Sequence, residues 1–160
     1  MGLLRFVIIS FCCIAHDPVL AQGSVAPAIS LASSGGQNHT FSDFSGRPAV
    51  IHFWATWCSA CLAELPQLID AIPGIESLDV SVIFIAADSM KATRAYLQAQ
   101  KLEIDVLVDQ YGKAMRDCHV KALPTSLFID ASGHIIETRQ GRIDWSSAET
   151  ISMLNRLRNH

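Results

Sequence analysis

Residues 53–66 read FWATWCSACLAELP, and this stretch decides the fold. An apolar run at residues 49–54 leads into it, and the β-forming side chains of this run predict a buried strand. Helical spacing then predicts a helix over residues 59–72. The two cysteines of the stretch, Cys58 and Cys61, therefore stand two residues apart where a strand passes into a helix.

The position of this cysteine pair predicts a reactive thiol. A residue at the start of a helix faces unpaired backbone N–H groups and the positive end of the helix dipole, and both favour a thiolate. We therefore predict that Cys58 is a nucleophile that attacks a disulfide and forms a mixed disulfide. Cys61, one helical turn further on, would then resolve this intermediate.

Strands and helices alternate along the rest of the chain. Apolar runs predict further strands at residues 80–87, 105–108, 125–130 and 135–140. Helical spacing predicts helices at residues 89–101, at residues 113–118 and from residue 146 onward. This order predicts an α/β fold in which helices cover both faces of a central mixed β-sheet, and the last two strands form a hairpin.

The last predicted helix has a recognisable start. Ser146 and Glu149 fit a capping box, in which each side chain bonds to the backbone N–H of the other residue. From helical spacing, we expect the buried face of this helix to consist of Ala148, Ile151, Leu154 and Leu157.

Composition limits the class of protein. The chain has 160 residues, enough for one compact domain, and half of them are hydrophobic, which excludes a disordered chain. The formal charge is -3 and the 12 basic residues do not form a cluster, so we expect no nucleic-acid partner. We also expect a monomer that uses no cofactor.

The N-terminal residues have the pattern of an export signal. Arg5 precedes an apolar run at residues 6–15, and the small side chain of Ala21 suits cleavage by a signal peptidase. We therefore predict a signal peptide at residues 1–21 and an exported, for example periplasmic, domain at residues 22–160. The apolar run is short for a membrane span, and an uncleaved membrane anchor is the alternative.

The sequence resembles the thioredoxin superfamily. The resemblance is carried by WCSAC after an apolar strand, by Pro66 in the following helix and by LPTSLFID at residues 123–130. FWATWC, and the ELP after the second cysteine, are similar to the exported branch that includes TlpA-like and ResA-like proteins and the cytochrome c biogenesis thioredoxins. The resemblance covers residues 25–155 and implies a thioredoxin-like fold and thiol-disulfide oxidoreductase activity.

This resemblance also implies a role and partners. The protein would reduce disulfides in exported client proteins, for example apocytochrome c, and a membrane-bound partner would supply the electrons. A thiol oxidase that donates disulfides is the alternative within the same class, and the redox potential separates the two. A copper or zinc chaperone is the alternative from another class, because thiolates bind Cu(I) and Zn²⁺. No second CxxC motif completes a four-ligand metal site, however.

Four further positions follow from the resemblance. Leu123 and Pro124 match the cis-proline loop, which lies beside the reactive pair and docks the substrate backbone. Trp57 stands where aromatic residues of the family shield the pair and contact partners. Glu64 matches a glutamate that ResA-like proteins hold near their cysteines, so it would modulate the thiol pKa and take the proton of Cys61. A solvated surface glutamate is the alternative.

His52 departs from the family pattern, because thioredoxins have a buried aspartate at this strand position. An imidazole beneath the pair would accept a proton near neutral pH, since its unperturbed pKa is about 6.5. A core histidine bonded to a neighbouring carbonyl is the alternative. We interpret Cys118 as a small buried hydrophobic residue and not as a third redox cysteine.

Overall fold

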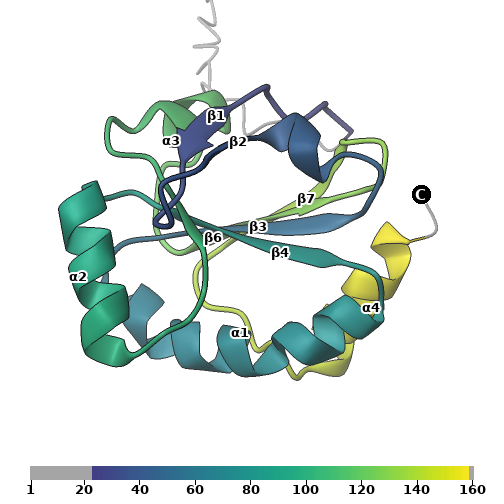
Figure 1. Ribbon diagram of the computed structural model, residues 1–160. Coiled ribbons are helices and arrows are strands. Elements are labelled where there is room, and N and C mark those ends of the chain that lie inside the picture. The colour runs from purple at the N-terminus through teal and green to yellow at the C-terminus, as the bar shows by residue number, and fades with distance from the viewer. Residues whose placement is uncertain (1–22, 159–160) are drawn as a thin grey trace, which may run out of the picture.

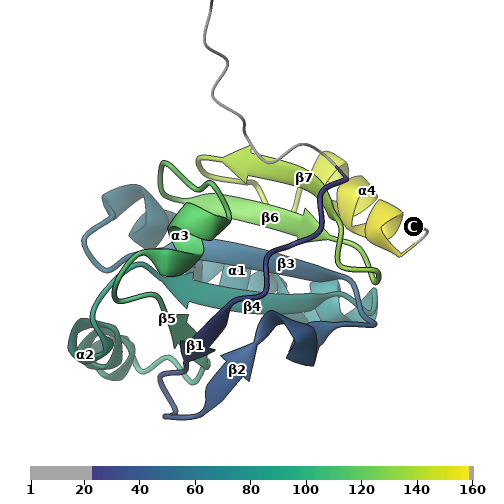
Figure 2. The ribbon, with the colours of Figure 1, turned by 90° about the horizontal axis from the view of Figure 1, so that it is seen from above.

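A five-stranded mixed sheet lies at the centre of the fold. The computed structural model describes residues 23–158 and places this sheet between two layers (Figure 1). The strands are β3 (Ala49–Trp54), β4 (Ser81–Ala86), β5 (Val106–Val108), β6 (Thr125–Ile129) and β7 (Ile135–Gln140). They lie side by side in the order β5-β4-β3-β6-β7 (Figure 2). Neighbours β3, β4 and β5 are parallel, whereas β6 is antiparallel to both β3 and β7.

Helices cover both faces of this sheet. The helices are α1 (Ser59–Ser77), α2 (Met90–Gln100), α3 (Lys113–Asp117) and α4 (Ala148–Leu157). Helices α1 and α4 lie against one face, and α3 lies on the other with the hairpin of β1 (Ser30–Ala32) and β2 (Asn38–Thr40) (Figure 1). A short 3-10 helix, η1 (Phe41–Phe44), follows the hairpin. The predicted α/β class, with a mixed sheet covered on both faces, is confirmed.

Strand β3 is buried along its whole length because both of its faces contact a core. Val50 and Trp54 pack into the cluster that contains the buried faces of α1 and α4. Ala49, Ile51 and Phe53 pack into the second cluster, beneath α3 and the N-terminal segment. The alternation follows the two-residue period of a strand and explains the continuous apolar run at this position.

The helix after the cysteine pair is longer than its spacing predicts. It ends at Ser77, and both Pro66 and Pro73 lie inside it. Each proline removes one backbone donor from the helix. Leu68 and Ile75 are buried against the core, and this packing extends the helix past both prolines.

The start of α4 lies one residue later than predicted. Ser147, not Ser146, is the N-cap, and its hydroxyl accepts from the Thr150 N–H at 3.2 Å. Ser146 instead donates to the Asp144 carboxylate at 2.6 Å. From the sequence, either of the two adjacent serines could cap the helix. The Asp144 carboxylate binds the Ser146 hydroxyl and leaves Ser147 as the cap.

The buried face of α4 shifts accordingly. It consists of Thr150, Met153, Leu154 and Leu157. Ile151, which we expected to point inward, is 45% exposed, and the expected burial of Ala148 is also wrong. Glu149 does not close a capping box but pairs with Arg139 of β7 at 2.8 Å.

The predicted signal peptide, residues 1–21, lies outside the described residues. Among residues 23–158, no helix has both the length and the apolar character that crossing a membrane requires.

The two faces of α4 give a stability prediction. Leu154→Ala empties a fully enclosed site and should lower the free energy of unfolding by about 2–4 kcal/mol. Ile151→Ala, on the same helix, should change it by less than about 1 kcal/mol, because the side chain already contacts water. Urea unfolding of both variants measures the difference. Equal losses would mean that Ile151 is buried together with Leu154, as the helical spacing predicted.

Candidate active site

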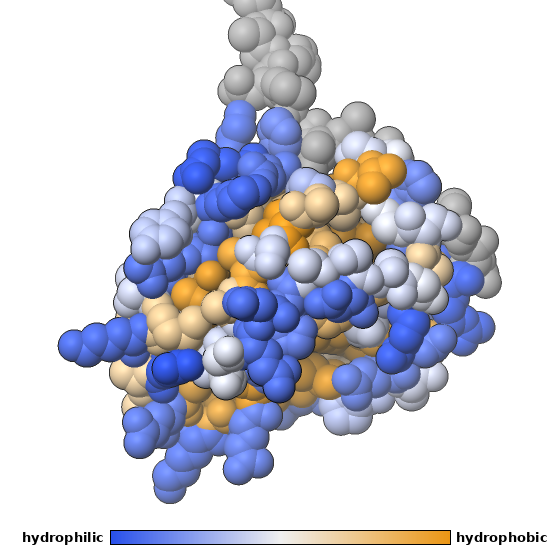
Figure 3. All heavy atoms as spheres, turned by 45° about the horizontal axis from the view of Figure 1, so that its top comes forward, coloured by the Kyte–Doolittle hydropathy of each residue, from blue (hydrophilic) through white to orange (hydrophobic). Residues whose placement is uncertain are grey.

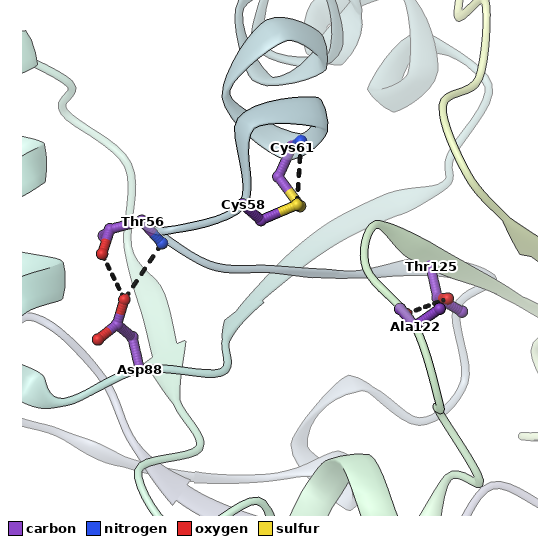
Figure 4. The surroundings of a disulfide bond; sticks show 6 residues. All are labelled: Thr56, Cys58, Cys61, Asp88, Ala122 and Thr125. Atoms are coloured by element: carbon purple, nitrogen blue, oxygen red, sulfur yellow. Dashed lines mark hydrogen bonds between the residues drawn. A yellow bond between two sulfur atoms is a disulfide. The ribbon is translucent and has the colours of Figure 1, made fainter.

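The cysteine pair lies at the start of α1. The chain leaves β3 at Trp54, turns, and enters the helix with Cys58 as its N-cap. Cys58 and Cys61 form a disulfide, and the Cys61 N–H donates to Cys58 Sγ at 3.2 Å (Figure 4). In the reduced protein, the same N–H group would stabilise a thiolate at Cys58.

The two cysteines differ in access to solvent. Cys58 is 8% exposed, whereas Cys61 is fully buried. Trp57, immediately before the pair, is 69% exposed. An incoming disulfide can therefore reach Cys58 but not Cys61.

The loop before the pair is fixed to the neighbouring strand. The Asp88 carboxylate, just after β4, accepts from the backbone N–H of Thr56 at 3.1 Å and from its hydroxyl (Figure 4). The same carboxylate accepts from the Ser89 N–H at 2.8 Å. Asp88 thus holds the loops that follow two parallel strands, and this limits the movement of the backbone that carries Cys58.

The loop before β6 lies at the same edge of the sheet. The peptide bond between Leu123 and Pro124 is cis, as the resemblance implied. Thr125 pairs with Phe53 across the antiparallel ladder, so this loop is beside the end of β3 from which the cysteine loop starts. The Thr125 hydroxyl donates to the Ala122 carbonyl at 2.8 Å, which closes the turn (Figure 4).

Glu64 is buried on α1, one turn after Cys61. Its Oε1 accepts from the Ile143 N–H at 3.1 Å and from Trp145 Nε1 at 2.8 Å. Its Oε2 is buried and has no partner in the described part of the chain. Burial raises the pKa of Glu64 above its ordinary value, and these two hydrogen bonds, with the charge of Arg142, oppose the rise only in part. The alternative of a solvated surface glutamate is therefore wrong.

His52 is fully buried in the middle of β3. Its Nδ1 forms a hydrogen bond of 2.9 Å with the Ser126 hydroxyl of β6, and not with a carbonyl. Its Nε2 has no partner among residues 23–158. Burial lowers the pKa of His52 to about 3, so the imidazole is neutral at physiological pH. The expectation of a histidine that titrates near neutrality is not met, because the sequence does not show the extent of its burial.

Trp145 links these two buried polar groups, and sequence reasoning missed it. Its indole N–H bonds Glu64, and its ring lies edge-on to His52 with the centroids 6.2 Å apart. Trp145 is 81 residues from Glu64 along the chain, so no local pattern connects them. The only available signal was a tryptophan in a polar loop just before a helix.

Cys118 and two buried aspartates, Asp109 and Asp130, have structural roles. Cys118 is buried, as predicted, and burial raises its pKa to about 12. Asp109 accepts from the Met115 N–H at 2.9 Å, and Asp130 accepts from the Ser132 and His134 N–H groups. Among residues 23–158 there is no group of three histidine, cysteine or acidic side chains arranged to hold a metal ion.

An apolar hollow lies away from the cysteine pair. Its volume is about 220 Å³, and residues 25–28, η1 and the first half of β3 line it. Neither cysteine belongs to this lining. On the face that carries β1 and β2, apolar atoms lie between hydrophilic ones (Figure 3). Trp57, the residue before the reactive pair, is exposed, and an exposed aromatic side chain there suits a polypeptide substrate better than an enclosed small molecule.

Comparison with known proteins identifies the family. The AhpC/TSA family, within the thioredoxin superfamily, matches residues 22–138. The chain belongs to this family. Thioredoxin-like protein YneN of Bacillus subtilis is 30% identical over 125 residues, which are 76% of this chain and 73% of that protein.

Two further similarities agree with this assignment. Thiol-disulfide oxidoreductase ResA of Bacillus thuringiensis subsp. konkukian is 29% identical over 120 residues, which are 74% of this chain and 69% of ResA. A putative thiol:disulfide interchange protein DsbE from Chlorobium tepidum has a similar structure, with a TM-score of 0.76 and 26% identity over 84% of this chain and 99% of that chain. The predicted thioredoxin-like fold and thiol-disulfide oxidoreductase class are confirmed.

The buried imidazole gives a pH prediction. A neutral His52 must remain unprotonated in the folded state, whereas the unfolded chain binds a proton below pH 6.5, so stability falls as the pH drops from 6.5 towards 3. Between pH 7 and pH 5, wild type should lose about 2 kcal/mol more stability than His52→Asn. Urea unfolding across this range measures it.

Glu64→Gln is the control, because Glu64 and His52 change the stability in opposite directions as the pH rises. A raised pKa makes the folded protein hold a proton that the unfolded chain releases, so this contribution to stability is lost as the pH rises through that pKa. Glu64→Gln should remove this fall in stability at rising pH. The loss of stability on acidification, which comes from His52, should remain. Equal acid sensitivity of wild type and His52→Asn would contradict a buried neutral imidazole.

Proposed function

We propose that this protein reduces disulfides in exported client proteins through the Cys58–Cys61 dithiol. The single observation that carries the proposal is the difference between the two cysteines at the start of α1. Cys58 is reachable and its sulfur accepts a backbone N–H, whereas Cys61 is enclosed behind it. This arrangement suits one attacking and one resolving thiol.

The proposed reaction conserves atoms and electrons. The Cys58 thiolate attacks one sulfur of the client disulfide, forms a mixed disulfide and releases the other client sulfur, which takes a proton. Cys61 then loses its proton and attacks Cys58 Sγ, which releases the second client thiol. The client gains two electrons and two protons, and the protein is left with the disulfide that the structure contains.

Glu64 would take the proton from Cys61. Cys61 is fully buried, so its proton needs an acceptor within the protein. Glu64 follows three residues later, on the same side of the helix, and its buried Oε2 has no other partner in the described residues. With its lowered pKa, His52 would stay neutral and help to hold Trp145 against Glu64.

Trp57, Leu123 and Pro124 would bind the client. Trp57 offers an exposed apolar surface beside Cys58. The cis-proline loop lies across the ladder from the last residues of β3 and is closed by the bond from Thr125. An extended client segment would lie between Trp57 and this loop, with its disulfide over Cys58.

The buried carboxyl group also supports reduction over oxidation. Once Glu64 is ionised, at a pH above its raised pKa, its negative charge opposes a thiolate on the cysteine pair and so destabilises the reduced form relative to the disulfide. A more stable disulfide corresponds to a lower, more reducing potential. The alternative, a thiol oxidase, requires a stabilised dithiol.

We further propose that the protein acts as a monomer in the cell envelope. The signal pattern at residues 1–21 and the resemblance to exported ResA-like proteins support export. The same resemblance supports apocytochrome c as a client and a membrane-bound electron donor. N-terminal sequencing of the protein recovered from cells would test cleavage after Ala21.

The redox potential tests the direction of the reaction. Equilibration in dithiothreitol or glutathione buffers, read by tryptophan fluorescence, should give one two-electron transition near the thioredoxin value of about -270 mV. A value near about -120 mV would instead identify a disulfide donor. Absence of any two-electron transition would overturn the oxidoreductase proposal and favour metal binding by the thiols.

Single cysteine variants test the order of attack. Cys61→Ser should accumulate a mixed disulfide between Cys58 and a disulfide peptide, because nothing resolves it, and turnover should fall by at least about 100-fold. Cys58→Ser should form little adduct, because the remaining thiols of the domain, Cys61 and Cys118, are buried. Mass spectrometry of the intact protein counts the adducts. More adduct on Cys58→Ser than on Cys61→Ser would reverse the assigned roles.

A further inference from the structure

We propose that the turn after β5, with Tyr111 and the basic segment that follows it, forms a docking surface for an acidic stretch of the client polypeptide beside the disulfide that Cys58 attacks. This inference rests on the proposed function, and it names the chemistry of the preferred client. We call Tyr111, Lys113, Arg116 and Lys121 the α3 docking surface.

The strand register places this surface at the edge that carries the cysteine pair. Trp54 of β3 pairs with Ala86 of β4, and Ala86 pairs with Val108 of β5. Adjacent strands are about 4.8 Å apart, so the ends of β3 and β5 are separated by about 10 Å. All three strands are parallel, and the loops that follow them emerge on one side, where α3 and the start of α1 lie at the left of Figure 1 and Figure 2.

The short distance has a consequence for the client. Cys58 is four residues beyond Trp54, and Tyr111 is three residues beyond Val108. The loops that carry Cys58 and Tyr111 therefore leave the same edge of the sheet from strands about 10 Å apart, and they lead to helices on opposite faces. A client segment that crosses this edge beside Cys58 would pass the loop that carries Tyr111.

Tyr111 projects into solvent from a rigid turn. It is 80% exposed, yet Arg116 donates to its backbone carbonyl at 2.7 Å. The Gly112 N–H closes the turn on the Asp109 carbonyl at 3.1 Å, and the Asp109 carboxylate bonds the Met115 N–H at 2.9 Å. The turn thus presents the phenol ring without itself needing to become ordered on binding, which lowers the entropic cost of docking.

A second exposed aromatic residue lies at the same edge. Single exposed hydrophobic residues are common and need no explanation. Among residues 23–158, however, the strongly exposed large hydrophobic residues are Val25, Trp57, Tyr111 and Ile151, and both aromatic ones follow parallel strands of one sheet edge. Exposed aromatic side chains are typical anchors of protein interfaces.

Charge then selects the kind of client. Residues 110–122 carry three basic residues and one acidic residue, Asp117, although the whole chain has a net charge of -3. Lys113 pairs with Asp117, and its side chain remains 58% exposed. A local positive field beside the reactive thiol attracts acidic segments and repels basic ones.

Peptide kinetics would test this inference. Two synthetic peptides share one cysteine, held as a mixed disulfide with a nitrothiobenzoate group, and differ only in glutamate or lysine at the positions around it. The reduced protein attacks the peptide sulfur and releases the coloured aryl thiol, and Cys61 then frees the peptide thiol. The symmetrical aryl disulfide, which has no peptide and carries the same anionic aryl group, is the reference for the reactivity of the Cys58 thiol.

Wild type should react about fivefold faster with the acidic peptide than with the basic one, and salt should reduce this ratio. Lys113→Glu should bring the ratio close to one. Arg158→Glu makes the same change of net charge at the far end of α4 and should leave the ratio as in wild type (Figure 1).

Tyr111→Ala should lower the acidic-peptide rate relative to the aryl disulfide rate about fivefold, because truncation of an anchoring aromatic residue removes its contact with the partner. Tyr111→Phe keeps the ring and should retain most of the peptide rate. Val25→Ala shortens an exposed side chain of the N-terminal segment. It should change neither the ratio of the acidic to the basic peptide rate nor the ratio of the acidic-peptide to the aryl disulfide rate.

Two results would count against the inference in different ways. If both Tyr111→Ala and Lys113→Glu kept the wild-type rate ratios, the α3 docking surface would be wrong and the proposed function would stand. No reaction of the reduced protein with the aryl disulfide would overturn the proposed function, and the docking surface with it.

Discussion

The geometry of the site depends on the two hydrogen-bonded ladders of β3. Because β4 is parallel and β6 antiparallel to β3, the end of β3, the end of β4 and the start of β6 meet at one edge of the sheet. The cysteine loop, Asp88 and the cis-proline loop are therefore neighbours, although they are far apart in sequence. No flexible hinge is needed to assemble them. Any change that weakened these ladders would separate the groups that act on one disulfide.

Beneath this edge, the protein maintains polar groups in an apolar core. His52 and Glu64 each have one nitrogen or oxygen atom bonded and one without a partner in the described chain, and Trp145 contacts both side chains. An unpaired buried polar atom costs on the order of 1–3 kcal/mol. Such a cost at two neighbouring positions is expected where chemistry, and not stability, determines the side chains.

Much of this arrangement follows from the sequence. The cysteine pair at a strand-to-helix junction, the apolar run of β3 and the LPT loop each have a local pattern. The predicted start of α4 is one residue too early, because the sequence does not distinguish Ser146 from Ser147 as a helix cap. In the structure, the Ser146 hydroxyl is bound to Asp144, and Ser147 caps the helix. Trp145 and the low pKa of His52 could not be predicted, because both depend on contacts between distant segments and on burial.

Cys118 determines how many electrons the folded domain can exchange. Its thiol is enclosed, and a pKa of about 12 leaves on the order of one molecule in 10⁵ as thiolate at neutral pH. Within the described residues, the pair at the start of α1 is then the only redox couple that exchanges with the surroundings. A native thiol-labelling reagent would report one reactive group, Cys58, per reduced domain and none per oxidised domain, because Cys61 is fully buried. The oxidation state of the protein in a living cell is thus a two-valued quantity that can be read without unfolding it.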